Sequence, residues 1–117
     1  MKLLLDEDLL KLRAQDPYDP IGPGKELEAS ELLVLVKFFT PDANWTWYAV
    51  SASKDPDSGD VQFFGLVKGL ETELGYFWLW ELESFRGQFG LPTERDLYWK
   101  PKPLSEVMRL VDEVGYA

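Results

Sequence analysis

The feature that most constrains the fold is a series of apolar segments that follow one another too closely to leave room for helices between them. Residues 32–39 are almost continuously apolar, which predicts a strand buried on both faces. Alternating or aromatic segments predict further strands at residues 44–53, 61–67 and 76–80. Because parallel neighbours need crossovers of a dozen or more residues, the sheet is predicted to be mainly antiparallel, with four to five strands.

The second and third of these strands are predicted to form a hairpin over residues 45–67. The segment between them, KDPDSGD, combines the residue types that are typical of turns. Its acidic residues also suggest a calcium-binding loop. Counted from Asp55, however, the fifth, sixth and twelfth positions of an EF-hand loop hold Gly59, Asp60 and Leu66, which do not match the required ligands and glycine. A plain hairpin turn is therefore predicted.

An N-terminal helix is predicted over residues 6–15, because Asp6 is a good N-cap and a leucine stripe follows. The stripe consists of Leu5, Leu9 and Leu12. Residues 16–31 are predicted to be a loop, since they contain the segment DPYDPIGPG. The helix is therefore tethered by a loop, and its pattern leaves open whether it packs on its own domain or on a partner.

The rest of the chain is predicted to hold two shorter elements and a final helix. Residues 81–87 favour one or two helical turns ended by a glycine, and residues 97–99 favour a short fifth strand. The C-terminal helix is predicted over residues 104–115, with Ser105 as its cap and Gly115 as its stop.

Together these elements predict a single α+β domain over residues 1–117, with short helices at the N-terminus, in the middle and at the C-terminus. The sheet core, with its short helix, is expected within residues 32–103. A chain of 117 residues has the length of one domain, and a hydrophobic fraction of 45% is enough for one core.

Charge and missing residue types argue against several functions. The chain holds 21 acidic and 12 basic residues, a formal net charge of −9, which argues against direct nucleic-acid binding. It contains no Cys and no His, which removes thiol chemistry and the usual zinc ligands. No phosphate-binding motif appears, so no cofactor and no metal are predicted. Without a signal peptide or a run of transmembrane length, a cytoplasmic location and no membrane contact are expected.

The segment TERD places Glu94, Arg95 and Asp96 side by side. An arginine among carboxylates can clamp an anionic ligand or hold one carboxylate ready as a base. Such a cluster also serves to fix a loop through ion pairs and caps. Both interpretations remain open, and the structural one is favoured.

The segment ELGYFWLWELES concentrates aromatic residues. As a strand, it would place Tyr76, Trp78 and Trp80 on one face, and Phe77 and Leu79 on the other. Phe77 and Leu79 are expected in the core. The opposite face is either sheltered by a terminal helix or forms a surface that meets a partner.

Over about residues 37–103 the chain resembles a family of small bacterial domains of unknown function, often encoded on plasmids and mobile elements. The matching segments are KFFTPDANWTW, FFGLV and ELGYFWLWELESFRGQFGLPTERDLYW. The resemblance implies the fold unit and a bacterial, intracellular setting, and it carries over no catalytic residue. It draws attention to six residues: Glu73, Gly75, Tyr76, Glu94, Arg95 and Asp96. The chain departs from the family at Trp78 and Trp80, where small polar residues are more usual.

Two hypotheses of function follow. The first is a non-enzymatic interaction or regulatory module that binds another protein, since Trp and Tyr are enriched at interface hot spots. The second is a ligand-binding domain or enzyme that uses Glu94, Arg95 and Asp96 with Tyr76 nearby.

Overall fold

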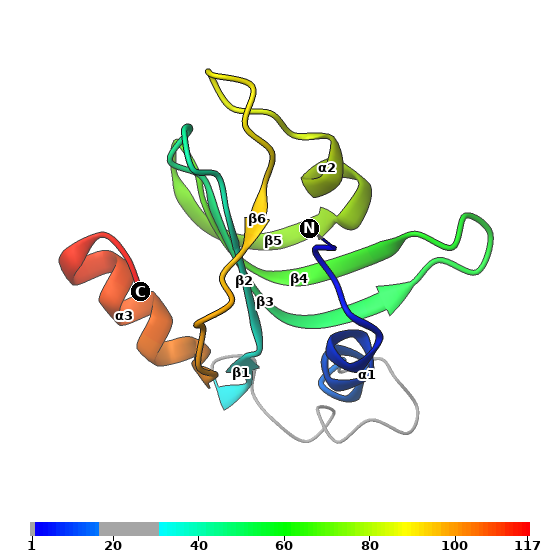
Figure 1. Ribbon diagram of the computed structural model, residues 1–117. Helices are drawn as coiled ribbons and strands as arrows, with labels where there is room; N and C mark the ends of the chain where they lie inside the picture. Colours follow the sequence, from blue (N-terminus) through cyan, green and yellow to red (C-terminus); the bar gives the residue numbers. More distant parts are fainter. Residues whose placement is uncertain (1, 17–30) are drawn as a thin grey trace.

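The computed structural model describes residues 2–16 and 31–117, and it confirms the α+β fold class (Figure 1). A five-stranded antiparallel sheet has the order β5-β4-β3-β2-β6, and β1 pairs with β7 in a second, two-stranded sheet. The elements are α1 (Asp6–Ala14), β1 (Leu33–Val34), β2 (Val36–Phe39), β3 (Thr46–Lys54), β4 (Val61–Lys68), β5 (Thr72–Trp78), α2 (Leu79–Ser84), β6 (Glu94–Arg95), β7 (Lys102–Pro103) and α3 (Leu104–Val114). The predicted loop at residues 16–31 lies mostly outside the described residues.

The predicted hairpin is confirmed, because β3 and β4 pair antiparallel and a tight turn joins them. In this turn Asp55 accepts hydrogen bonds from the Asp57 amide at 3.0 Å and from the Ser58 hydroxyl at 2.9 Å. Gly59 adopts a positive φ of 75°, a conformation that glycine reaches without a steric penalty. The turn is thus closed by its own hydrogen bonds, as a plain hairpin turn.

The predicted single strand at residues 32–39 is wrong, because the strand breaks at Leu35. A continuous strand would keep its even-numbered side chains on one face. Instead, Leu32 and Val34 lie in one core cluster while Val36 and Phe38 lie in the other. The break at Leu35 reverses the faces, so that β1 pairs with β7 and β2 pairs with β3.

The fourth strand is longer at its start and shorter at its end than predicted. It begins at Thr72, inside the predicted loop, and it ends at Trp78. Helix α2 starts at Leu79 because the Glu81 carboxylate accepts a hydrogen bond from the Trp78 amide at 3.0 Å. The helix ends at Ser84, where the chain becomes extended, rather than at the predicted glycine.

The predicted fifth strand at residues 97–99 is wrong, since the fifth strand of the sheet is β6, at Glu94–Arg95. The Asp96 carboxylate accepts a hydrogen bond from the Tyr98 amide at 2.9 Å, which turns the chain away from the sheet.

The two predicted helix N-caps are also wrong, whereas the predicted stop of α3 is confirmed. Leu5, not Asp6, is the N-cap of α1, and its amide donates to the Asp8 carboxylate at 3.2 Å. Pro103, not Ser105, is the N-cap of α3. Gly115, with a φ of 87°, stops α3 as predicted.

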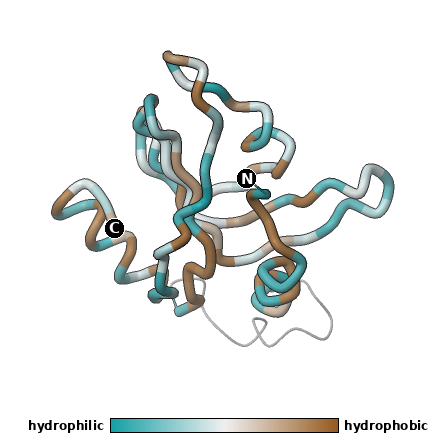
Figure 2. The backbone as a smooth tube through the Cα atoms, in the orientation of Figure 1, coloured by the Kyte–Doolittle hydropathy of each residue, from teal (hydrophilic) through white to brown (hydrophobic). Residues whose placement is uncertain are grey.

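The five-stranded sheet has a hydrophobic core on each face. Leucines of α1 and α2, with Leu3 and Leu4 ahead of α1, cover the first core, which contains Phe38 and Phe63. Figure 2 shows this N-terminal segment as a hydrophobic stretch that leads into α1. Helix α3 covers the second core, on the other side of the sheet (Figure 1). Helix α1 therefore packs on its own domain, which the sequence alone left open.

Candidate functional site

The segment Glu94–Asp96 does not form a single site, because successive residues of a strand point to opposite faces of the sheet. Arg95 reaches the α1 side and forms a hydrogen-bonded ion pair with Asp8, with both side chains largely buried. Asp96 faces the α3 side, where its carboxylate lies 3.7 Å from Lys37 Nζ. Arg95 thus holds the N-terminal helix to the sheet, and Asp96 belongs to a separate network.

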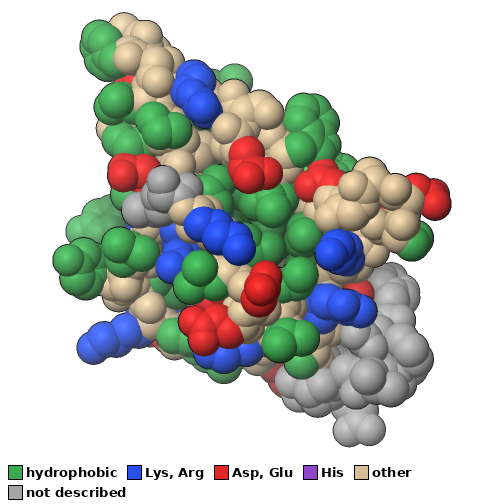
Figure 3. Space-filling model, turned by 45° about the vertical axis from the view of Figure 1, so that its right-hand side comes forward, with side chains coloured by type: hydrophobic (Ala, Val, Ile, Leu, Met, Phe, Trp, Pro, Cys, Tyr) green, Lys and Arg blue, Asp and Glu red, His purple; other side chains and the backbone are tan. Residues whose placement is uncertain are grey.

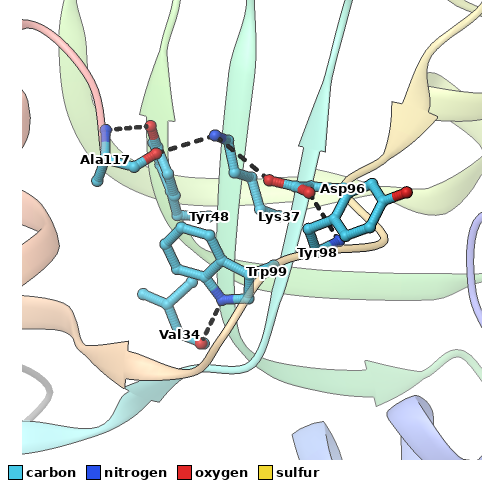
Figure 4. A network of polar contacts seen from close by, with 7 residues as sticks. All are labelled: Val34, Lys37, Tyr48, Asp96, Tyr98, Trp99 and Ala117. Atoms are coloured by element: carbon cyan, nitrogen blue, oxygen red, sulfur yellow. Dashed lines mark hydrogen bonds and ion pairs between the residues drawn. The ribbon is translucent and has the colours of Figure 1, made fainter.

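This network ties the end of α3 to the sheet (Figure 4). Lys37 Nζ donates a hydrogen bond to the Ala117 carbonyl oxygen at 2.9 Å, and the Ala117 amide donates to the Tyr48 hydroxyl at 3.2 Å. The Trp99 indole donates to the Val34 carbonyl oxygen at 2.9 Å. Lys37 also lies 5.6 Å from the centre of the Trp99 ring, a favourable cation–π distance. The contacts position α3 against the second core.

Burial raises the pKa of Tyr48 above its ordinary value of 10.0, although the Ala117 hydrogen bond acts in the opposite direction. Below pH 10 the hydroxyl keeps its proton in both the folded and the unfolded chain. Above pH 10 the unfolded chain loses this proton first, so the free energy of unfolding is expected to fall as pH rises through the folded-state pKa. Denaturant titrations between neutral and alkaline pH should show that the free energy of unfolding falls less steeply with pH for Tyr48→Phe than for the wild type.

The matched control is Tyr98→Phe, which removes the hydroxyl of an exposed tyrosine. This variant should follow the wild-type dependence on pH. If the free energy of unfolding fell equally steeply with pH for the wild type and for Tyr48→Phe, the buried hydroxyl would not be the cause of the loss of stability.

Tyr76 does not lie near the Glu94–Asp96 segment. It belongs to β5, and β5 and β6 are the two opposite edges of the five-stranded sheet. With neighbouring strands about 4.8 Å apart, the two edges are separated by roughly 19 Å. The arrangement that the enzyme hypothesis requires, with Tyr76 beside these carboxylates, is therefore not formed.

The aromatic residues of the segment Tyr76–Trp80 are divided between surface and core. Phe77 is buried and stacks on Phe63, with ring centres 5.2 Å apart. Tyr76 is 61% exposed, and Trp80, the second residue of α2, is 57% exposed. Trp78 is half-buried. The predicted common face of the three residues ends at Trp78, because Trp80 lies in a helix instead of the strand.

A groove lies where the start of β5 meets α3. This β5–α3 groove has a volume of about 510 Å³, and its apolar wall includes Leu74, Met108 and Val111. Glu73 and Asp112 are also among the residues that line it. Sequence reasoning missed this groove, because Leu74 was placed in a loop and no local pattern pairs it with a helix more than thirty residues later.

A second groove, the β5–α2 groove, lies at the other end of β5. It has a volume of about 560 Å³ and is lined by Trp78 and Trp80 together with Asp55, Asp60 and Glu83. The carboxylates come from the β3–β4 turn and from α2. Two of the predicted surface residues, Trp78 and Trp80, therefore share one groove after all, although they lie in different elements.

Both grooves are acidic. The described residues that line them include five acidic residues and neither Lys nor Arg. Hydrogen bonds from the Asp57 amide and the Ser58 hydroxyl lower the pKa of Asp55, which keeps that carboxylate ionised. Asp60 Oδ2 is buried, and no donor from the described part of the chain reaches it. Elsewhere basic and acidic side chains are mixed, as Figure 3 shows for one face of the molecule.

Other residues of the TPDANW and GQFGLP segments hold a loop in place. Asp42 accepts hydrogen bonds from the amides of Phe89 at 2.7 Å and Leu91 at 3.4 Å. The Thr40 hydroxyl accepts a hydrogen bond from the Trp45 amide at 2.9 Å. These contacts are structural, and they connect the β2–β3 turn to the loop that precedes β6.

Comparison with known proteins gives one match. A family model described as protein of unknown function (DUF2958) matches residues 5–116. No curated protein and no solved structure matches the chain significantly.

Proposed function

The chain belongs to the family of proteins of unknown function DUF2958, and from the geometry of β5 and α2 we propose that it is a non-enzymatic interaction or regulatory module that binds another protein. The observation that carries this proposal is the exposure of Tyr76 and Trp80, at 61% and 57%, beside two grooves. Exposed aromatic residues at the rim of a groove are typical of binding surfaces, because Trp and Tyr are enriched among the residues that contribute most to binding.

The alternative, an enzyme or ligand-binding domain built on Glu94, Arg95 and Asp96, has less support. Arg95 is held by Asp8, Asp96 is held near Lys37, and the two side chains lie on opposite faces of the sheet. A clamp for an anion needs these groups to converge on one ligand. The structure instead uses them to attach α1 and α3.

We further propose a bacterial, cytoplasmic setting, following the family resemblance, and direct contact with neither nucleic acid nor membrane. The net charge of −9 supports the expectation that the chain does not bind nucleic acid directly, because binding to phosphates depends mainly on Lys and Arg. Among residues 2–16 and 31–117, no helix is long and apolar enough to cross a membrane.

The test compares aromatic variants in the recovery of a partner from the cells that make the protein. The purified protein is cross-linked in an extract, and the same cross-linked partner is then quantified for each variant. Trp80→Ala and Tyr76→Ala are each expected to weaken the complex by about 2 kcal/mol, or roughly thirtyfold, as hot-spot residues do. Both side chains are exposed, so thermal unfolding should change little.

Tyr98→Ala is the matched control, because it removes an exposed aromatic side chain that lines neither β5 groove. It should leave recovery of the partner unchanged. A partner that is recovered equally with Trp80→Ala, Tyr76→Ala and the wild type would contradict the proposed surface.

A further inference from the structure

The two edges of the five-stranded sheet differ in how they are protected. Strand β6 has two residues, whereas β5 has seven and pairs with β4 in an unbroken register. Within the part of the chain that the structure describes, β5 has no strand on its other side. Short strands, bulges, Pro and Lys are the usual protection against edge pairing. Residues 72–78 pair without a bulge and contain neither Pro nor Lys, and their one charged residue is Glu73, so β5 has little of this protection against a partner strand.

One face of β5 is open at its middle residue. Gly75 has no side chain, and a Cβ built there would meet no described atom within 4 Å. On either side of it Leu74 and Tyr76 are exposed. An added strand would therefore meet apolar side chains on the face of β5 that carries Leu74 and Tyr76, and no side chain at Gly75 on the other face.

The two grooves lie at the two ends of the same edge. Leu74 lines the β5–α3 groove and Trp78 lines the β5–α2 groove. A strand rises about 3.3 Å per residue, so these two positions are roughly 13 Å apart. An extended peptide paired with β5 would thus place side chains at both grooves within a single strand length.

The charge of the grooves indicates the chemistry of such a peptide. Glu73 and Asp112 line one groove, and Asp55, Asp60 and Glu83 line the other. The β5–α2 groove offers both tryptophan rings and acidic residues. A lysine or arginine side chain would match both, because its apolar stem would pack on the rings and its charge would face the carboxylates.

We propose that the partner binds by strand addition: an extended, lysine- or arginine-rich segment of another protein pairs with the free edge of β5, and a basic side chain enters the β5–α2 groove. This inference rests on the proposed function and specifies the mode of binding and the chemistry of the partner. A second copy of the chain is a poorer occupant, because β5 carries Glu73 and no base to face the acidic grooves.

The test uses three labelled peptides and fluorescence polarisation with the full chain. In the first peptide lysine alternates with valine, and in the second glutamate replaces each lysine. The third repeats the lysine–valine sequence with every amide N-methylated, which removes the main-chain donors and keeps the side chains. The lysine–valine peptide is expected to bind, the glutamate peptide to show no binding, and the N-methylated peptide to bind about tenfold more weakly or worse.

Charge reversal locates the binding site. Asp112→Lys and Glu83→Lys each change one exposed side chain at one groove, and each should weaken lysine–valine binding about tenfold. Glu31→Lys is the matched control, because Glu31 is exposed and lines neither groove. The substitution changes the net charge of the chain by the same amount.

Each contrary result has a distinct meaning. Equal affinity for the N-methylated peptide would overturn strand addition and leave the interaction surface standing. If the lysine–valine peptide did not bind, or if Glu31→Lys lowered its affinity as much as the groove variants, a basic partner segment would be ruled out. The Trp80→Ala recovery experiment would still decide the proposed function. A dimer in light scattering that Glu73→Lys dissociates would overturn the proposal in favour of a second copy.

Discussion

Replacing Leu12 with alanine is expected to lower the free energy of unfolding by about 2–5 kcal/mol, as for other fully buried leucines. Leu12 has 0% exposure and is the point at which α1 enters the first core. The loss of its side chain leaves a cavity between α1 and the sheet. Chemical denaturation followed by tryptophan fluorescence measures the change directly.

Leu10→Ala is the matched control, because it makes the same change in the same helix at a position that is 69% exposed. Its effect should stay below about 0.5 kcal/mol. If the two variants were equally stable, α1 would not be part of the folded domain, and its packing in cis would be wrong.

Replacing Gly65 with alanine is expected to destabilise the protein by about 3 kcal/mol, the upper end of the range for overpacking. A Cβ on Gly65 would overlap the main-chain carbonyl of Tyr48 on the neighbouring strand β3. The backbone itself must move to make room, whereas the end of a flexible side chain would simply turn aside.

Gly75, which pairs with Gly65 across β4 and β5, provides the control. A Cβ on Gly75 meets no described atom within 4 Å. Gly75→Ala should therefore leave the free energy of unfolding unchanged or raise it by up to about 1 kcal/mol, because alanine reduces the conformational freedom of the unfolded chain. Similar destabilisation by both substitutions would show that the close approach at Gly65 is not the cause.

Local patterns were enough to predict the fold class, the hairpin and the terminal helices. The turn residues of KDPDSGD between two apolar segments indicate the hairpin, and Gly115 stops α3 whatever lies around it. The break at Leu35 was not predictable in this way. The run 32–39 is apolar throughout, and only the presence of two cores on opposite faces of the sheet requires the switch between Val34 and Val36.

The boundaries that failed depend on single hydrogen bonds with few local signals. Glu81 starts α2 by capping Trp78, which converts the end of an apparent aromatic strand into a helix. Asp96 turns the chain after Arg95 and so moves the fifth strand from residues 97–99 to β6. In both cases a carboxylate three or fewer residues from the amide overrides the propensity of the neighbouring aromatic residues.

The sequence alone did not indicate the shape of the candidate surface. The sequence suggested Tyr76, Trp78 and Trp80 as a surface, and the structure exposes Tyr76 and Trp80. The grooves beside them need Met108 and Asp112 from α3 and Asp55 from a distant turn. Such partners meet only through tertiary packing, so no pattern within one segment identifies them.

The most direct measurement is amide hydrogen exchange of the full chain with and without the lysine–valine peptide. Strand addition predicts that, when the peptide is bound, the amides of residues 72–77 that point away from β4 exchange more slowly, because they gain hydrogen-bond acceptors. The Trp78 amide already donates to Glu81 and is not expected to change. The amides of Glu94–Asp96, at the opposite edge, should exchange at an unchanged rate. Protection at Glu94–Asp96 with none on β5 would contradict the account and return attention to that edge of the sheet.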